Sequence, residues 1–84
     1  KLGQNYPNPF NPVTTIKYQL AKPGFVKLNV YDITGERMKK LLAKRQNPGI
    51  YHVDFEAGDL SSGIYFYRLE AGGLQQTRQM LMIK

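Results

Sequence analysis

The chain of 84 residues has no cysteine and no tryptophan, and its only histidine is His52. Without cysteine it can form neither a disulfide nor a thiolate metal site. A single histidine cannot supply a pair of zinc ligands, and His52 has no neighbour in the sequence that would complete a nucleophilic relay. No stretch approaches the roughly 18 consecutive apolar residues that a membrane-spanning helix needs. These absences exclude the commonest forms of metal, redox and nucleophilic chemistry.

Acidic residues are also few, with six Asp and Glu against twelve Lys and Arg and a net charge of +6. Asp54 and Glu56 would share one strand face about 7 Å apart, at roughly 3.3 Å per residue. A flat strand face offers no pocket for the two carboxylates of a glycosidase, and the acidic spacing matches no calcium loop. The sequence Ser61-Ser62-Gly63 is not the nucleophile motif Gly-x-Ser-x-Gly, and no glycine loop for phosphate is present. We therefore expect a non-enzyme with no catalytic residue, no bound metal and no cofactor.

The length indicates one domain, residues 1–84, with a thin hydrophobic core. Residues 1–12 form a Pro-rich lead-in, in which Pro7, Pro9 and Pro12 rule out a helix or an interior strand. We expect this segment to run extended along the surface, with Tyr6 and Phe10 docked on the body of the domain. Residues 13–84 form that body.

The body alternates apolar and polar residues with period two, which is typical of half-buried strands. Such runs cover residues 14–20, 26–30, 51–55, 64–69 and 76–83, and turn residues rich in Gly and Pro separate them. Residues 36–45 are ambiguous, because they are good helix formers while the hairpins on both sides favour a strand. We predict a strand there, and we predict that residues 64–69 form a central strand.

Short strands with turn signals every 8–12 residues predict an all-β fold, an immunoglobulin-like antiparallel sandwich of about seven strands. Leu60 and Tyr65 stand where a tyrosine corner is found, a motif in which the tyrosine hydroxyl bonds to the backbone a few residues upstream. Most of the ten aromatic residues fall on the inward phase of their strands and belong to the core. Tyr31 is out of phase with the buried positions.

One group of basic residues, here called the basic cluster, is concentrated in the sequence: Arg37, Lys39, Lys40, Lys44 and Arg45. Such a cluster can bind phosphate or an acidic sugar. Lysines on an edge strand also prevent sheet-to-sheet aggregation. We favour the second interpretation, because no run of aromatic residues accompanies the cluster to stack on bases. No nucleic-acid partner is expected.

Four stretches carry a family resemblance: residues 4–16 (QNYPNPFNPVTTI), 30–37 (VYDITGER), 60–69 (LSSGIYFYRL) and 82–84 (MIK). Together they span nearly the whole chain. In these stretches the chain resembles the C-terminal sorting domains of the Bacteroidetes-type type IX secretion system, together with the related immunoglobulin-like domain of flagellar hook-capping proteins. The asparagine-proline opening is the most specific part. The resemblance also favours a strand after the turn at Tyr31.

The resemblance implies a domain at the C-terminus of a larger secreted protein that reaches the cell surface or the outside. Its partners would be the outer-membrane secretion machinery, a sortase that commonly cleaves the domain, and an upstream cargo domain in the same chain. The residues that would carry recognition are Asn5, Pro7, Pro9, Tyr31, Asp32, Gly35, Gly63, Tyr65 and Lys84. Two other functions stay open: a carbohydrate-binding or spacer module of a secreted glycoside hydrolase, and a structural assembly domain of the hook-capping type.

Overall fold

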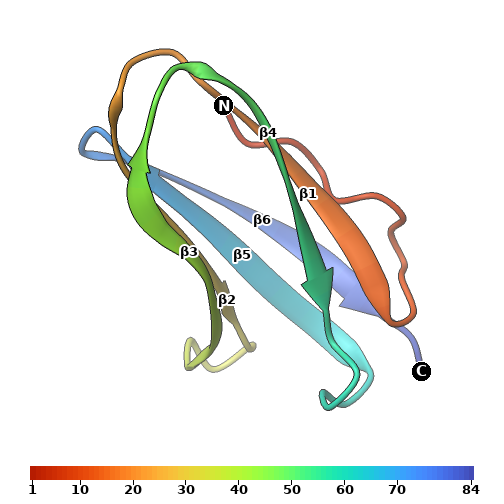
Figure 1. The fold of residues 1–84 in the computed structure, drawn as a ribbon. Helices are drawn as coiled ribbons and strands as arrows, with labels where there is room; N and C mark the ends of the chain where they lie inside the picture. The colour runs from red at the N-terminus through yellow and green to blue at the C-terminus, as the bar shows by residue number, and fades with distance from the viewer.

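In the computed structural model, residues 1–84 are all described, and they form six β-strands and no helix (Figure 1). The strands are β1 (Val13–Leu20), β2 (Gly24–Tyr31), β3 (Arg37–Gln46), β4 (Gly49–Glu56), β5 (Gly63–Ala71) and β6 (Leu74–Met82). They make two antiparallel sheets, one of β1 and β4 and the other in the order β3-β2-β5-β6. The predicted all-β class and sandwich architecture are confirmed, with six strands where about seven were expected.

The alternating pattern sets the two faces of each strand. In β2, Val26, Leu28 and Val30 are fully buried, while Phe25 and Lys27, on the opposite phase of the strand, are exposed. The same alternation in β1 buries Ile16 and Tyr18. Residues directly opposite each other in an antiparallel pair share a face of the sheet. The pairing register therefore places buried residues of one strand beside buried residues of the next.

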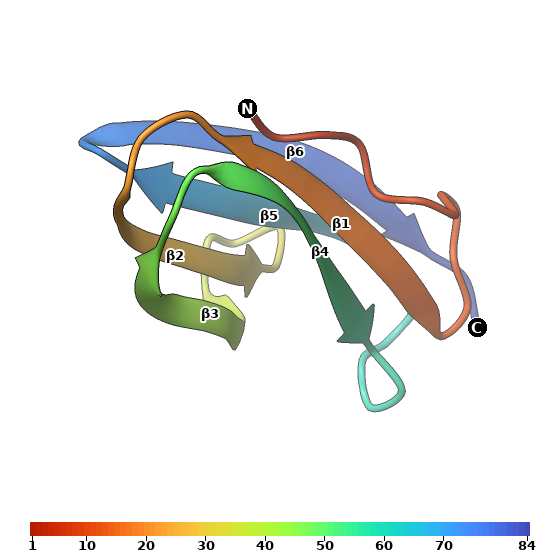
Figure 2. The ribbon, with the colours of Figure 1, turned by 45° about the horizontal axis from the view of Figure 1, so that its top comes forward.

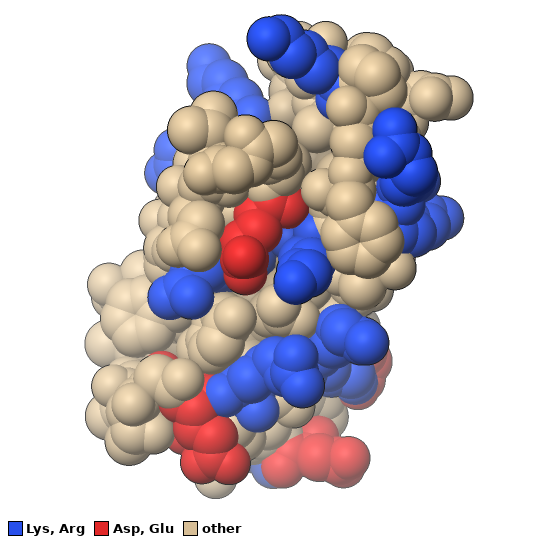
Figure 3. All heavy atoms as spheres, turned by 90° about the vertical axis from the view of Figure 1, so that its left-hand side faces the viewer, with Lys and Arg blue, Asp and Glu red and all other residues tan.

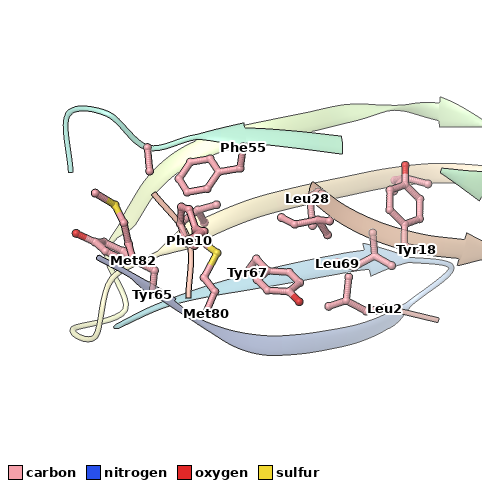
Figure 4. Close-up of a cluster of buried hydrophobic side chains, with 14 residues drawn as sticks. Leu2, Phe10, Tyr18, Leu28, Phe55, Tyr65, Tyr67, Leu69, Met80 and Met82 are labelled. Atoms are coloured by element: carbon pink, nitrogen blue, oxygen red, sulfur yellow. The ribbon is translucent and has the colours of Figure 1, made fainter. Parts of the chain in front are cut away.

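The core lies between the two sheets and contains 14 buried hydrophobic residues. Figure 4 shows Phe10, Phe55, Tyr65, Met80 and Met82 gathered at one end of this core. The rings of Phe10 and Phe55 meet edge to face, with their centroids 6.1 Å apart. Both sheets and the N-terminal segment therefore contribute to a single core.

Residues 1–12, here called the strap, are part of the fold (Figure 2). Along β1, the amide of Gly3 donates to the carbonyl of Lys17 at 2.8 Å, and the amide of Tyr6 donates to the carbonyl of Thr15 at 2.9 Å. At its far end, the amide of Phe10 donates to the carbonyl of Leu81 in β6 at 3.0 Å. The strap thus takes the place of a further strand and joins β1 to β6 along one side of the sandwich.

The prediction that Tyr6 and Phe10 both dock on the body is correct for Phe10 and wrong for Tyr6. Phe10 is 2% exposed, whereas Tyr6 is 81% exposed. The reason is the alternation of an extended chain, in which successive side chains point to opposite sides. Asn5 turns inward and is buried, so Tyr6 turns to solvent.

Three finer expectations are confirmed. Residues 37–46 form strand β3, whose tertiary pairing overrides their helix propensity, with register shifts opposite Leu28/Asn29 and Val30/Tyr31. Strand β5 lies inside its sheet between β2 and β6. The tyrosine corner is present, because the Tyr65 hydroxyl donates to the carbonyl of Ser61 at 2.7 Å.

Candidate functional site

Four segments that are far apart in the sequence lie at one end of the sandwich, because successive strands run up and down. This end, here called the motif end, consists of residues 9–12, 32–36, 57–62 and 83–84 (lower part of Figure 1). Every one of the four stretches that carry the family resemblance reaches it. The fold therefore gathers the resembling motifs into one region.

Direct hydrogen bonds link the strap to the last residues of the chain. The Asn8 side-chain oxygen Oδ1 accepts from the amide of Leu81 at 2.9 Å, and the carbonyl of Phe10 accepts from the amide of Ile83 at 3.0 Å. The amide of Lys84 donates to the hydroxyl oxygen of Ser62 at 2.8 Å. Strap, β4–β5 loop and final residues thus form one bonded unit.

Asn5 holds the strap to the body from within. It is 2% exposed, and its Nδ2 donates to Thr14 Oγ1 at 2.9 Å and to the carbonyl of Pro7 at 3.2 Å. Its amide donates to the hydroxyl of Tyr67 at 2.8 Å, and that hydroxyl donates to the carbonyl of Gly3 at 2.7 Å. Burial raises the pKa of the Tyr67 hydroxyl, which keeps it in its donating form. Asn5 is therefore placed to support the fold and has almost no surface to offer a partner.

The β2–β3 turn is built around Asp32. One carboxylate oxygen, Oδ1, accepts from the Thr34 hydroxyl at 2.6 Å, the Thr34 amide at 2.8 Å and the Glu36 amide at 3.0 Å. The hydrogen bond from the Thr34 hydroxyl, followed by the backbone amides, lowers the pKa of the Asp32 carboxyl. Gly35 has a φ of 88°, in the region where only glycine is unstrained. The turn is thus fixed by its own residues.

The other expected recognition residues divide between surface and interior. Pro7, Pro9 and Lys84 are exposed, whereas Tyr65 is 7% exposed and Gly63 is half-buried. Tyr31 is half-buried on the outer face of the four-stranded sheet, with the Arg68 guanidinium 4.8 Å from its ring centroid.

Strand β3 splits the basic cluster between its two faces. Lys39 and Lys44 lie opposite the buried Val30 and Val26, on the side of the sheet that faces the core. The remaining members lie on the outer face: Arg37, Lys40 and Arg45. All five are exposed. A cluster in the sequence is therefore two separate groups in the fold.

On the outer face, cations from other strands join those of β3, and Figure 3 shows Lys and Arg side chains spread over this side of the molecule. Lys27 of β2 lies opposite Glu70, and Arg68 of β5 lies opposite Asn29. Asn29 is 4% exposed and its side-chain oxygen Oδ1 has no hydrogen-bond partner. Sequence analysis did not single out Lys27, Asn29 or Arg68, although the alternation of β2 and β5 places these three on the polar phase. The missing information was which strands are neighbours.

The placement of the carboxylates and of the largest hollow gives little support for catalysis or for metal binding. Asp54 Oδ1 accepts from the Thr15 hydroxyl at 2.8 Å, and Glu56 Oε1 accepts from the amide of Gly58 at 3.0 Å. No group of three or more His, Cys, Asp or Glu side chains could hold a metal ion. A hollow of about 310 Å³ at the end opposite the motif end is lined by residues such as Lys1, Leu20 and Leu74, with no carboxylate or imidazole among them. The chain also lacks any helix with the length and apolar character needed to cross a bilayer.

Comparison with known proteins gives one match, to a family. No curated protein and no solved structure matches the chain. The model of the family described as the secretion system C-terminal sorting domain matches residues 4–84. This match covers the strap, all six strands and the motif end. The chain therefore belongs to the family of secretion system C-terminal sorting domains, and its function is that of a C-terminal signal by which type IX secretion exports a cargo protein to the cell surface or outside.

Proposed function

We propose that this domain is a folded, non-catalytic export address whose motif end is read by the outer-membrane secretion machinery. The cargo is a domain upstream in the same chain, and a sortase removes the sorting domain after export. The observation that carries the proposal is the convergence of the motif segments. The bonds of Leu81, Ile83 and Lys84 to the strap and to Ser62 join three of these segments into one surface.

The recognition residues have two kinds of role in this proposal. Pro9, Gly35 and Lys84 are exposed at or beside the motif end and are placed to contact a partner. Asn5 and Tyr65 are buried and hold the segments that carry those contacts. A partner would thus recognise the folded domain, and an unfolded chain with the same motifs would present no such surface.

The absence of a covalent step is supported by the surroundings of the titratable groups. His52 is exposed on the polar face of β4 opposite Lys17, and Asp54 is engaged with Thr15. A general acid and base must converge on one substrate position. No pair of these groups faces such a position, so cleavage is assigned to the sortase.

The test fuses residues 1–84 to the C-terminus of a neutral reporter that carries its own leader, in a host with type IX machinery. The reporter should reach the cell surface or the medium. The variant Lys84→Glu should reduce export without changing the melting temperature, whereas Lys22→Glu, a charge reversal in the loop at the opposite end, should leave export unchanged. A reporter that stays in the periplasm, while a sorting domain known to work exports the same reporter, would refute the proposed function.

A further inference from the structure

The two sheets have two edges that no other part of the chain covers. The outer edge of β6 is engaged by the strap through Phe10, and the outer edge of β1 is engaged by the strap through Gly3 and Tyr6. Strands β3 and β4 have a neighbour on one side only. Figure 2 shows β4 at the margin of its sheet, on the side away from β1 and the strap. An uncovered edge presents unpaired amides and carbonyls that invite another strand.

Strand β3 carries the usual protections of an exposed edge. It contains the five residues of the basic cluster, and two register shifts interrupt its pairing with β2. Charged side chains on an edge, including charges on the core side, and irregular register all prevent an extra strand from pairing. Strand β3 is therefore an unpaired edge that is protected against the addition of another strand.

Strand β4 has no register shift and no charge on its core side, and its two carboxylates, Asp54 and Glu56, lie on the outer face. It pairs with β1 in eight consecutive positions without a register shift, and Gly49–Glu56 contains no Lys, Arg or Pro. None of the ten backbone hydrogen bonds outside the strand ladders involves a residue of β4. Because every second residue of an antiparallel edge strand directs its amide and carbonyl outward, β4 presents a regular row of free groups.

The side chains beside this edge are only partly covered. Tyr51 and Val53 of β4 and Leu42 of β3 are half-buried, although they pack against the core. Lys39 and Lys44 lie on the core-facing side of β3 and are nevertheless exposed, so no strand of this chain lies over them. The chain crosses from β3 to β4 through two residues, 47 and 48, which places the free edge of β4 on the same side of the sandwich as β3. A strand added beside β4 would extend the smaller sheet over this part of β3.

We propose that the free edge of β4 accepts an extended segment of a protein partner as an additional strand. The segment carries acidic side chains on the face that it turns toward Lys39 and Lys44, and an apolar side chain between them to meet Leu42. The chemistry of the edge selects this occupant: the free backbone groups require a polypeptide, and the two lysines favour carboxylates. The proposal rests on the proposed function, because the segment is taken to belong to the secretion machinery.

A second copy of this chain fits the edge poorly. The core-side residues that a second β4 would bring over Lys39 and Lys44 are Tyr51, Val53 and Phe55, none of which is acidic. Such pairing would also bring together two β3 strands that each carry five cations. Like charges brought together across an interface cost free energy, so self-pairing is disfavoured.

The probe for the experiment is a blocked seven-residue peptide in which threonine alternates with glutamate, leucine and glutamate. Titrated into the 84-residue chain labelled with ¹⁵N at low salt, it should bind saturably with a Kd below about 1 mM. Amide shifts should concentrate in Gly49–Glu56 and around Lys39 and Lys44. Two N-methylated forms of the peptide, each blocking one alternate set of amides, separate strand pairing from charge attraction. One form should bind at least about tenfold more weakly and the other should bind like the parent, since only one set of amides faces β4.

The charge requirement is tested by reversing two exposed lysines. The double variant Lys39→Glu with Lys44→Glu should bind the acidic peptide about tenfold or more weakly. It should instead bind more tightly to a peptide with lysine in place of glutamate. Arg37→Glu with Arg45→Glu is the matched control, because it changes the net charge equally on the outer face of the same strand. It should have a much smaller effect.

Several results would overturn the edge proposal: no saturable binding, shifts that lie away from β4, equal loss for both N-methylated peptides, or equal loss for both double variants. A dimer by sedimentation that maps to β4 would assign the edge to a second copy and would also overturn it. Export of the reporter is an independent measurement. Normal export by a chain that does not bind the peptide refutes only the edge proposal, whereas an unmutated fusion that binds the peptide and is not exported refutes the proposed function.

Discussion

Replacing Tyr67 with phenylalanine removes one oxygen atom from the junction between the strap and β5. The side chain is fully buried, and its hydroxyl donates to the carbonyl of Gly3 at 2.7 Å and accepts from the amide of Asn5 at 2.8 Å. The ring keeps its place in the core, so no large cavity forms. The variant Tyr67→Phe therefore reports on the attachment of the strap alone.

The expected loss of unfolding free energy depends on whether the Gly3 carbonyl and the Asn5 amide find other hydrogen-bond partners. Each hydrogen bond contributes about 1 kcal/mol, and a buried group left without a partner costs about 1–3 kcal/mol. Asn5 is buried and its amide would have no alternative, whereas the half-buried Gly3 carbonyl can turn to water. We expect a loss of about 2–4 kcal/mol, a large share of the roughly 4–13 kcal/mol that a domain of this size has.

Urea denaturation with a shared m value measures the loss, and hydrogen exchange locates it. The amides of Gly3 and Tyr6, which bond to β1, should exchange much faster in Tyr67→Phe. Tyr65→Phe is the matched control, because it removes a single hydroxyl bond to Ser61 that does not involve the strap. A loss below about 0.5 kcal/mol, the range of an ordinary surface substitution, would refute the assignment of Tyr67 as the anchor of the strap. So would equal exchange of the strap amides in the two variants.

The Tyr67 hydroxyl also makes the stability of the folded domain depend on pH in the alkaline range. Burial raises the pKa of Tyr67 in the folded chain, so folding favours the protonated form. Its contribution is complete below the unfolded pKa of about 10 and is lost as the pH rises from there toward the folded pKa. Tyr67→Phe should therefore lose stability less steeply above this pH. Tyr18, whose pKa burial also raises, contributes to the dependence that remains.

Three further perturbations have matched controls or signatures. Phe10→Ala should cost about 3–4 kcal/mol in urea denaturation because it empties a buried site, while Tyr6→Ala should stay within about 0.5 kcal/mol; similar losses would contradict the difference in burial. Because the pKa of Asp32 is lowered in the folded chain, its contribution to stability is present above the unfolded pKa of about 4 and is lost as the pH falls through the folded pKa. Melting curves from pH 2 to 7 should show that Asp32→Ala lacks this acid-dependent loss. Gly35→Ala should cost about 1–2 kcal/mol because φ is 88°, whereas Gly24→Ala, which meets open space at an ordinary φ, should cost less than half as much; equal costs would argue against strain at Gly35.

The parts of the fold that could be predicted from the sequence are those that depend on local pattern. Alternation in residues 26–30 and 51–55 identified strands, because period two is a property of the extended chain itself. The tyrosine corner was predictable for the same reason, since its bond joins residues four positions apart. For residues 37–46 local propensity favoured a helix, and only the neighbouring hairpins and the family resemblance indicated the strand that forms.

The parts that escaped prediction depend on pairs that are distant in the sequence. Asn5 was expected to take part in recognition, yet its bonds to Thr14 and Tyr67 could not be anticipated without knowing that the strap runs along β1 and reaches the Tyr67 hydroxyl of β5. The division of the basic cluster into Lys39 and Lys44 on one face and the remaining three on the other depends on two register shifts. The pairing register depends on the patterns of both strands and on the turn between them, so the residues of one strand do not determine it.

The strap sets the time at which this domain can finish folding. Leu2 bonds to Gln76 and Asn8 bonds to Leu81, so these contacts join residues 74 and 73 positions apart. A ribosome must therefore release residues 81–83 before the strap can close on β6, and contacts of such long range are slow to form. A nascent or truncated chain stays open at this seam. The closed seam therefore requires the last strand, and a chain that stops before residues 81–83 cannot form it.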